Sequence, residues 1–308
     1  MCIRRLRDNT RAPISSVRVG ILAQVGNWRL WEELTNCIDQ VIETVDTAFI
    51  LVSSHVEGKE RLVSARYDCA KVITVPNYGA DIAPFFTQLS RISQQLADAN
   101  FVIKLHTKTN DAWREGMIEP ICGTASAVRQ SLEAFRSNPK LGMLGALNFT
   151  YFIDSNDEMI IKNRLAIQYH FDSSFYAVYD EISNVSHFDA EFYSKWRGNS
   201  DLKSLTRQEL VNHFHQHGRS ERRIFSKVMQ EHLESNGYPQ FIAGTIFWFR
   251  VAPMVDFLRR YRADEIANTM RSESGYFRDE NIDRVTHAWE RCVSLVFHSQ
   301  GYTMAGVK

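Results

Sequence analysis

The sequence has few cysteines, and none of them forms a pair that would organise a fold. Its 308 residues include five cysteines, which are widely spaced and form no CxxC motif. An odd number of scattered cysteines argues against a disulfide framework and against a zinc cluster. We therefore expect reduced thiols in a cytoplasmic protein.

The sequence also lacks an apolar run long enough to cross a bilayer. The N-terminal segment MCIRRLRDNTRAP is basic, but no apolar stretch follows it, so it does not have the form of a secretory signal. We expect residues 1–16 to form a flexible tail. A peripheral contact with the inner face of a membrane is the alternative for the arginines of this tail, which are Arg4, Arg5, Arg7 and Arg11.

No excess of charge of either sign is present. The 36 basic side chains equal the 36 acidic ones, so the formal net charge is zero. Such a chain has no global field that would attract nucleic acid or anionic lipid. We expect no nucleic-acid partner, and any bound anion must be held by a local group of cations.

Two glycine-rich signatures are absent as well. The segment QVGNW at 24–28 follows the first predicted strand and offers no GxGxxG, which argues against an oxidoreductase on a Rossmann fold. The chain contains no GxxxxGK[ST], so it does not have the phosphate loop of many phosphoryl-transfer proteins.

What is present is an alternation of apolar runs and amphipathic stretches. Apolar runs rich in β-branched residues predict strands at 17–26, 47–54, 71–77 and 101–107, and helical spacing predicts helices at 28–45 and 81–99. The composition, 44% hydrophobic, is sufficient for a large core. This order points to an α/β sandwich with a mainly parallel central sheet.

The second half of the chain is less regular. We predict a helix at 119–139, strands at 140–148 and 239–250, and a long amphipathic helix at 281–302. Residues 150–237 are polar and aromatic by turns, with helical patches at 206–217 and 226–236, and we interpret them as a helical insertion. His213 and His217 share a helical face there, but no HExxH pattern or nearby cysteine supports a metal site.

Polar side chains gather where the predicted strands end. Ligands of open parallel sheets bind beyond the carboxyl ends of the strands. This places on one edge Gln24, Ser53, Asn77, Asp81, His106 and Lys108. Gly79 permits a positive φ, and a helix beginning at Asp81 beside two basic side chains suits a diphosphate. The alternative is that Asp81 only caps the helix and Lys108 is a solvated loop residue.

Five segments in order resemble the rhamnan synthesis protein F family. They are YGADIAPFF (78–86), FVIKLHTKTNDAWRE (101–115), LGMLGAL (141–147), FIAGTIFWFR (241–250) and THAWER (286–291). The resemblance covers roughly residues 17–302, and it is weak between 150 and 237. It implies a glycosyltransferase of the GT-A type, whose nucleotide-binding sandwich presents a sugar donor to an acceptor.

The same resemblance implies partners and a division of the chain. The donor would be a nucleotide-activated sugar, such as a rhamnose or another deoxyhexose, and the acceptor a growing polysaccharide, glycan or lipid-linked saccharide, with inversion at the transferred carbon. Residues 17–149 would bind the donor, 150–237 an acceptor or partner, and 238–308 would complete the domain on the acceptor side. A non-catalytic glycan- or nucleotide-binding protein on the same fold is the alternative.

One departure from many GT-A enzymes concerns the metal. Where these enzymes carry Asp-x-Asp to hold a divalent cation against the diphosphate, this chain reads His106, Thr107, Lys108. We hypothesise transfer that requires no metal, with His106 and Lys108 neutralising the leaving diphosphate. A divalent metal such as manganese or magnesium is the alternative, with Asp81 as its leading carboxylate.

A base for the acceptor hydroxyl is sought near the C-terminus. The candidates are Glu280, Asp283, His287 and Glu290. The alternative for Glu290 is a structural ion pair with Arg291. For the acceptor we predict Trp113, Arg114, Gly244, Thr245 and Trp248. A core position for Trp248 and a surface loop for Trp113 and Arg114 are the alternatives.

Overall fold

The computed structural model describes residues 17–152, 188–195, 202–218, 223, 225–227, 230, 240–273 and 285–308. The predicted bases Glu280 and Asp283, the tail at 1–16 and most of the predicted helix at 226–236 lie outside these ranges.

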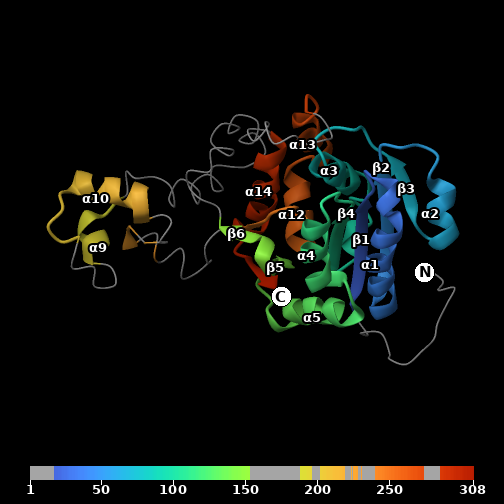
Figure 1. Ribbon diagram of the computed structural model, residues 1–308, viewed down its shortest axis with the longest axis horizontal. Helices are drawn as coiled ribbons and strands as arrows, with labels where there is room; N and C mark the ends of the chain where they lie inside the picture. The colour runs from blue at the N-terminus through green and yellow to red at the C-terminus, as the bar shows by residue number, and fades with distance from the viewer. Residues whose placement is uncertain are drawn as a thin grey trace.

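The fold is built on a seven-stranded sheet in the order β3-β2-β1-β4-β8-β5-β9 (Figure 1). Its strands are β1 (Arg18–Gln24), β2 (Asp46–Ser54), β3 (Lys71–Thr74), β4 (Phe101–His106), β5 (Leu141–Ala146), β8 (Phe247–Arg250) and β9 (Thr303–Val307). Only β8 runs antiparallel to its neighbours, while the other pairs are parallel. The predicted α/β class with a mainly parallel sheet is confirmed.

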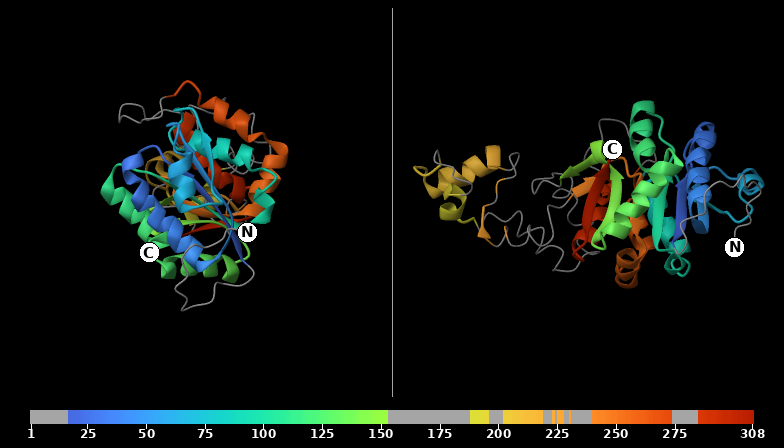
Figure 2. Two further views of the ribbon diagram at one scale, coloured as in Figure 1. Left: turned by 90° about the vertical axis from the view of Figure 1, so that its right-hand side faces the viewer. Right: turned by 90° about the horizontal axis from the view of Figure 1, so that it is seen from below.

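Helices cover both faces of this sheet, as Figure 2 shows. Their bounds are α1 (Trp31–Thr44), α2 (Glu60–Arg66), α3 (Ile82–Arg91), α4 (Asp111–Cys122), α5 (Ala125–Ser137), α12 (Val251–Arg260), α13 (Ala263–Thr269) and α14 (Val285–His298). Helices α1, α4 and α5 pack their apolar stripes with one face of the strands, and α3, α12, α13 and α14 pack with the other. Because strand residues alternate between faces, each strand contributes to two cores.

A smaller set of elements lies outside these layers. Strands β6 (Thr150–Phe152) and β7 (Gln240–Ile242) pair antiparallel. Helices α9 (Ala190–Lys195) and α10 (Arg207–His213), with the π-turn Phe214–Gly218, share a separate hydrophobic cluster around Phe188 and Phe225. These helices agree with helical structure inside the predicted insertion at 150–237, whose role stays a prediction.

Three predicted elements are each divided in the structure. The predicted helix at 81–99 is α3, which ends at Arg91, followed by a separate 3₁₀ turn at Leu96–Asp98. The predicted helix at 119–139 is interrupted at Thr124, whose extended backbone and side chain cap α5 by accepting from the amide of Ala127. The predicted strand at 239–250 is β7 and β8, separated by a turn in which Gly244 and Thr245 have φ of 75° and 56°. A positive φ at both positions ends an extended strand, so the turn replaces the ladder there.

The cysteines are consistent with the expectation of reduced thiols only in part. Cys37, Cys122 and Cys292 are free and buried. For Cys69 the expectation was wrong, because this residue is disulfide-bonded. Within the described part of the chain, no helix is both long enough and apolar enough to span a bilayer.

Candidate active site at the carboxyl edge of the sheet

Three strand ends bring polar side chains into one row. In the register of the sheet, Gln24 of β1 lies beside Ser53 of β2 on one side and His106 of β4 on the other. All three are buried, and the hydroxyl of Ser53 makes no hydrogen bond. The predicted edge therefore exists, and an unsatisfied buried hydroxyl within it is a group that a ligand could satisfy.

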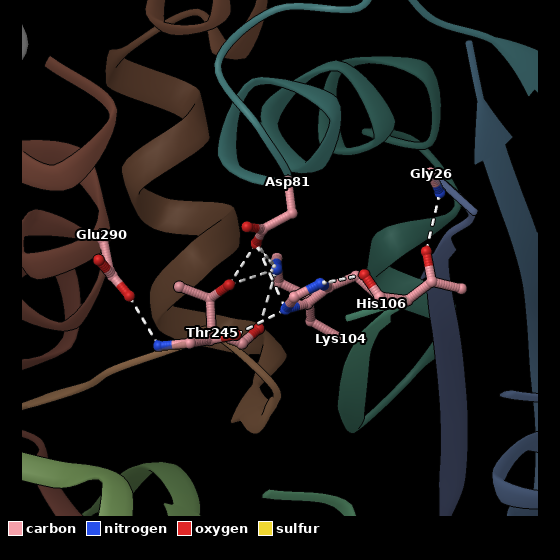
Figure 3. A network of polar contacts seen from close by, with 8 residues as sticks. Gly26, Asp81, Lys104, His106, Thr245 and Glu290 are labelled. Carbon is pink, nitrogen blue, oxygen red and sulfur yellow. Dashed lines mark hydrogen bonds and ion pairs between the residues drawn. The ribbon is translucent and has the colours of Figure 1, made fainter. Parts of the chain in front are cut away.

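A buried ion pair joins this row to the start of α3. The ammonium of Lys104, a side chain only 1% exposed, lies 2.5 Å from Oδ2 of Asp81 (Figure 3). It also donates to the carbonyl and the hydroxyl of Thr245, at 2.8 and 2.9 Å. The same Oδ2 accepts from the Thr245 hydroxyl. The three hydrogens of Lys104 are thus used within the protein, so Lys104 positions other groups rather than binding a ligand.

The protonation of Asp81 follows from these contacts. Burial by itself would raise the pKa of Asp81, but attraction from the Lys104 ammonium, with hydrogen bonds from Lys104 and Thr245, holds it below the usual range. Asp81 is therefore an ionised carboxylate, and its second oxygen, Oδ1, has no hydrogen-bond partner among the described residues. Although Asp81 precedes α3, its side chain makes no capping bond to that helix. The interpretation of Asp81 as only a helix cap is wrong.

His106 is neutral in this setting. Burial lowers its pKa to about 4, although the nearby Asp81 carboxylate opposes the shift. Its Nε2 lies 2.6 Å from the carbonyl of Gly244, and Nδ1 lies 3.2 Å from that of Thr107. A neutral ring has one N–H, which belongs on Nε2, where the carbonyl is closer. Without a bound anion His106 therefore carries no positive charge at neutral pH, and the role that we predicted for it beside a diphosphate stays a prediction.

The turn between β7 and β8 connects this network to α14. The amide of Gly244 donates to Oε1 of Glu290 over 2.7 Å, and Oε2 of Glu290 lies 3.8 Å from Arg291. Burial raises the pKa of Glu290, in spite of the hydrogen bond from Gly244. The alternative of an ion pair with Arg291 is therefore present as a contact of 3.8 Å, and Oε2 of Glu290 makes no hydrogen bond to a described residue.

Lys108 and Trp113 flank the turn on the other side. The Lys108 ammonium lies 4.8 Å from the centre of the Trp113 ring and forms no ion pair with a described residue. Trp113 is 40% exposed and packs edge-on against Phe149. Between this pair and β1, the Thr107 hydroxyl accepts from the amides of Gly26 and Asn27, at 2.9 and 3.1 Å. These two hydrogen bonds therefore hold the loop after β4 against the loop after β1. Lys108 is the cation of the loop after β4.

Two predicted acceptor residues belong to the framework instead. Trp248 is fully buried, and its indole donates to the carbonyl of Ile121, so the prediction that it stacks on a sugar is wrong. Arg114 is buried and bound to Glu33, at 2.5 Å, and to Asp111, at 2.9 Å. Its Nη1 also donates to the carbonyl of Lys108, so Arg114 holds the loop after β4 against α1 and α4.

The remaining predicted residues lie around the site with less definite contacts. Asn77 is exposed on the loop before α3, and Gly79 has a φ of 61° in that loop, as expected for a close approach. His287 lies on α14 one turn from Glu290. The donor, acceptor and catalytic roles given to all these residues stay predictions.

Sequence reasoning missed Lys104 as a site residue. Its signal was visible, because a lysine between the apolar residues of a central strand must find a buried counter-charge. The identity of that partner was not visible, since Asp81 and Thr245 come from segments that are distant in sequence.

The comparisons with known proteins leave the family open. No protein-family profile matches the chain, and no curated protein matches it. The resemblance to the rhamnan synthesis protein F family thus stays a prediction. Among solved structures, the chain is similar to core-mannan synthase A of Aspergillus fumigatus, determined in its Mn/GDP form. The TM-score is 0.33 and the identity 10%, over 95% of this chain and 72% of the other, which is too low to establish a shared family or activity.

Proposed function

We propose that the protein is a glycosyltransferase that moves a sugar from a nucleotide-activated donor to a glycan acceptor. The observation that carries the proposal is a set of three ionisable groups around the Gly244 turn, at the carboxyl edge of the parallel strands, each with an atom that makes no hydrogen bond to a described residue. These are Oδ1 of Asp81, Oε2 of Glu290 and the ammonium of Lys108. Such an edge is where open α/β sheets bind nucleotides. The sequence resemblance adds the reaction class.

Each of the three groups has a separate role in the proposed reaction. Lys108 attracts the diphosphate and stabilises the negative charge that develops on it as it leaves. Asp81, fixed by Lys104, accepts a hydrogen bond from a hydroxyl of the donor sugar. Glu290, with its raised pKa, accepts the proton of the acceptor hydroxyl.

The reaction is then a single displacement. The acceptor oxygen forms a bond to the anomeric carbon, the bond from that carbon to the diphosphate oxygen breaks, and its electron pair leaves with the nucleoside diphosphate. The proton of the acceptor hydroxyl passes to Glu290. This attack inverts the anomeric carbon, and the donor sugar is taken to be a deoxyhexose such as rhamnose.

A divalent metal fits this set of residues poorly. In the part of the chain that the structure describes, no three ligating side chains converge on one point. The Asp81 carboxylate already pairs with the Lys104 ammonium, so a divalent ion there would lie against a buried cation. We propose transfer without a metal, with Lys108 supplying the charge.

Binding of nucleotides by the purified protein tests the proposal. Thermal shift and calorimetry would be run with UDP, dTDP, GDP and CMP and their sugars, with EDTA or with manganese. We expect one nucleotide to bind regardless of metal and Lys108→Ala to weaken it. The matched control is Lys140→Ala, because Lys140 is exposed before β5, at the opposite edge of the sheet.

The outcomes separate the candidate functions. Binding that EDTA abolishes and manganese restores would refute transfer without metal. No binding of any nucleotide would refute the donor site. If a nucleotide sugar binds but is neither transferred to a saccharide nor slowly hydrolysed, the non-catalytic binding protein is the correct description.

A further inference from the structure

A cavity lies at the edge of the sheet opposite to the candidate active site. It has a volume of about 660 Å³ and opens between the end of α5 and the start of α12. Val17 before β1, Phe101 at the start of β4 and Arg250 at the end of the antiparallel β8 line it. The length of β4 separates it from His106 by roughly 16 Å, at about 3.3 Å per residue. The cavity is therefore independent of the proposed transferase site.

The walls of this cavity are apolar with an excess of positive charge. Its apolar lining includes Phe101, Phe135 and Val255, while its charged lining consists of the three arginines Arg136, Arg250 and Arg259 and one acid, Asp256. Asp256 is paired with Arg259 on the same helix at 2.8 Å, with both side chains mostly exposed. Arg136 also has a carboxylate beside it, that of Glu133 on the same helix, at 3.8 Å. Of the three arginines, Arg250 is therefore the one that contributes an uncompensated positive charge to the cavity.

Arg250 supplies a cation that is fixed in place and has no counter-charge. Its Nε donates to the carbonyl of Leu141, and its Nη2 donates to those of Phe135 and Asn138. The guanidinium carbon lies 5.2 Å from the ring centre of Phe101. No described carboxylate pairs with Arg250, and Nη1 has no hydrogen-bond partner among the described residues. Burial lowers the pKa of Arg250, the direction expected of a cation that lacks an anionic partner.

The start of α12 adds to the same field. This helix begins directly after Arg250, carries no acidic residue in its first turn and has no side-chain cap. The amide of Val251 donates to the carbonyl of Asn100, and Pro253 has no N–H, so it is the positive dipole end of the helix that reinforces the guanidinium.

We propose that this cavity binds a small amphipathic anion, in which one carboxylate or phosphate group lies on Arg250 and an apolar chain or ring fills the space between α5 and α12. The volume is in the range of about 300–1,000 Å³ that small-molecule sites occupy. The anionic group compensates the unpaired guanidinium, and the apolar body displaces water from the aromatic wall. A free inorganic anion satisfies only the first requirement, and a neutral amphiphile only the second.

Calorimetric titration tests this with four probes: octyl phosphate, octanoate, octyl glucoside and inorganic phosphate. We expect saturable binding of the first two and none of the last two. Arg250→Gln removes the cation but keeps an amide donor, and Ala252→Phe fills the cavity from an exposed position on the first turn of α12. Each variant should weaken binding by about tenfold or more. The control is Arg91→Gln, an exposed arginine at the end of α3.

Each result has a definite meaning. If neither octyl phosphate nor octanoate binds saturably, the proposal is wrong. It is also overturned if Ala252→Phe binds them as tightly as the unaltered protein, or if octyl glucoside binds equally well. Should Arg250→Gln fail to fold, Ala252→Phe alone decides the location of the site. Nucleotide binding at the other edge should be unchanged by Ala252→Phe, so failure here is distinct from failure of the proposed function.

Discussion

Replacement of Lys104 by methionine should destabilise the protein strongly, and more at pH 7 than at pH 5. Methionine keeps an unbranched side chain, one atom shorter, but removes the charge that lies 2.5 Å from Asp81. The carboxylate would then be buried without a cation. Removing one partner of a buried pair costs about 3–5 kcal/mol, a large part of the total stability of about 5–15 kcal/mol of a typical domain.

The pH dependence follows from the direction of the pKa shift. In the unaltered protein the pKa of Asp81 lies below its value in the unfolded chain, which is about 3.9. The ionised carboxylate therefore stabilises the fold at any pH above about 3.9. This contribution is lost as the pH falls through the pKa of the folded state. Without Lys104, burial is largely unopposed and the pKa of Asp81 rises. In the variant, protonation of Asp81 at pH 5 would remove the buried charge and reduce the loss of stability, whereas at pH 7 the carboxylate would stay ionised to a greater extent.

Urea unfolding followed by tryptophan fluorescence at both pH values measures this. Combination with Asp81→Asn should recover a large part of the loss, because the double variant buries no charge at this pair. The matched control is Arg262→Met, which breaks an exposed pair with Asp264 of similar length, 2.7 Å, and should leave the unfolding midpoint almost unchanged. A loss below about 1 kcal/mol for Lys104→Met, or one equal at both pH values and in the Asp81→Asn background, would refute the reasoning.

Three further predictions concern the same edge. Glu290→Gln keeps an oxygen that can accept the hydrogen bond from the Gly244 amide but removes the proposed general base. Turnover should therefore fall by about 10²–10⁴-fold while nucleotide affinity is unchanged. Full activity in a transfer assay would exclude Glu290 as the base. The pKa of His106 is about 4 in the folded protein and about 6.5 in the unfolded chain, so the unfolded chain takes up this proton at a higher pH. The free energy of unfolding should therefore fall by about 3 kcal/mol as the pH drops from 6.5 to 4. In His106→Gln that part of the acid loss should disappear from the urea curves, and an unchanged loss would assign it to other groups. Gly79→Ala should lower the free energy of unfolding more than Gly58→Ala does. Both glycines have a positive φ, but an added Cβ meets another atom only at Gly79, at 2.6 Å, whereas at Gly58 nothing lies within 4 Å. Equal losses of stability would show that the loop before α3 can shift to accommodate the methyl group.

The strands of the first half could be predicted because local sequence determines them. The β-branched run that ends at Gln24 and the one that ends at His106 are strands within a residue or two of the predicted ends. Their parallel arrangement follows from the helices between them. The edge on which the candidate site lies could therefore be located from sequence.

The second half could not be predicted with the same success because tertiary contacts override its local pattern. The run FIAGTIFWFR has the composition of one strand, yet the chain turns at Gly244, where the carbonyl is bound by His106 and the amide by Glu290. The same contacts made Trp248 a misleading candidate. Aromatic content alone does not distinguish a residue facing a ligand from one facing α4, whereas the alternation of faces after the turn decides it.

The buried ion pair of Lys104 and Asp81 is weak evidence for a contribution to stability and better evidence for a functional role. An apolar pair of similar volume would usually stabilise such a position as well or better, so a charged pair retained at the end of a central strand calls for another reason. Its effect here is geometric: Lys104 binds both Asp81 and Thr245, and thereby fixes the start of α3 relative to the turn before β8. Oδ2 of Asp81 holds that geometry, and Oδ1 makes no hydrogen bond to a described residue. In the proposed reaction, a carboxylate fixed in this way needs no further ordering to accept a hydrogen bond from a sugar hydroxyl, which is the form of preorganisation that binding and catalysis require.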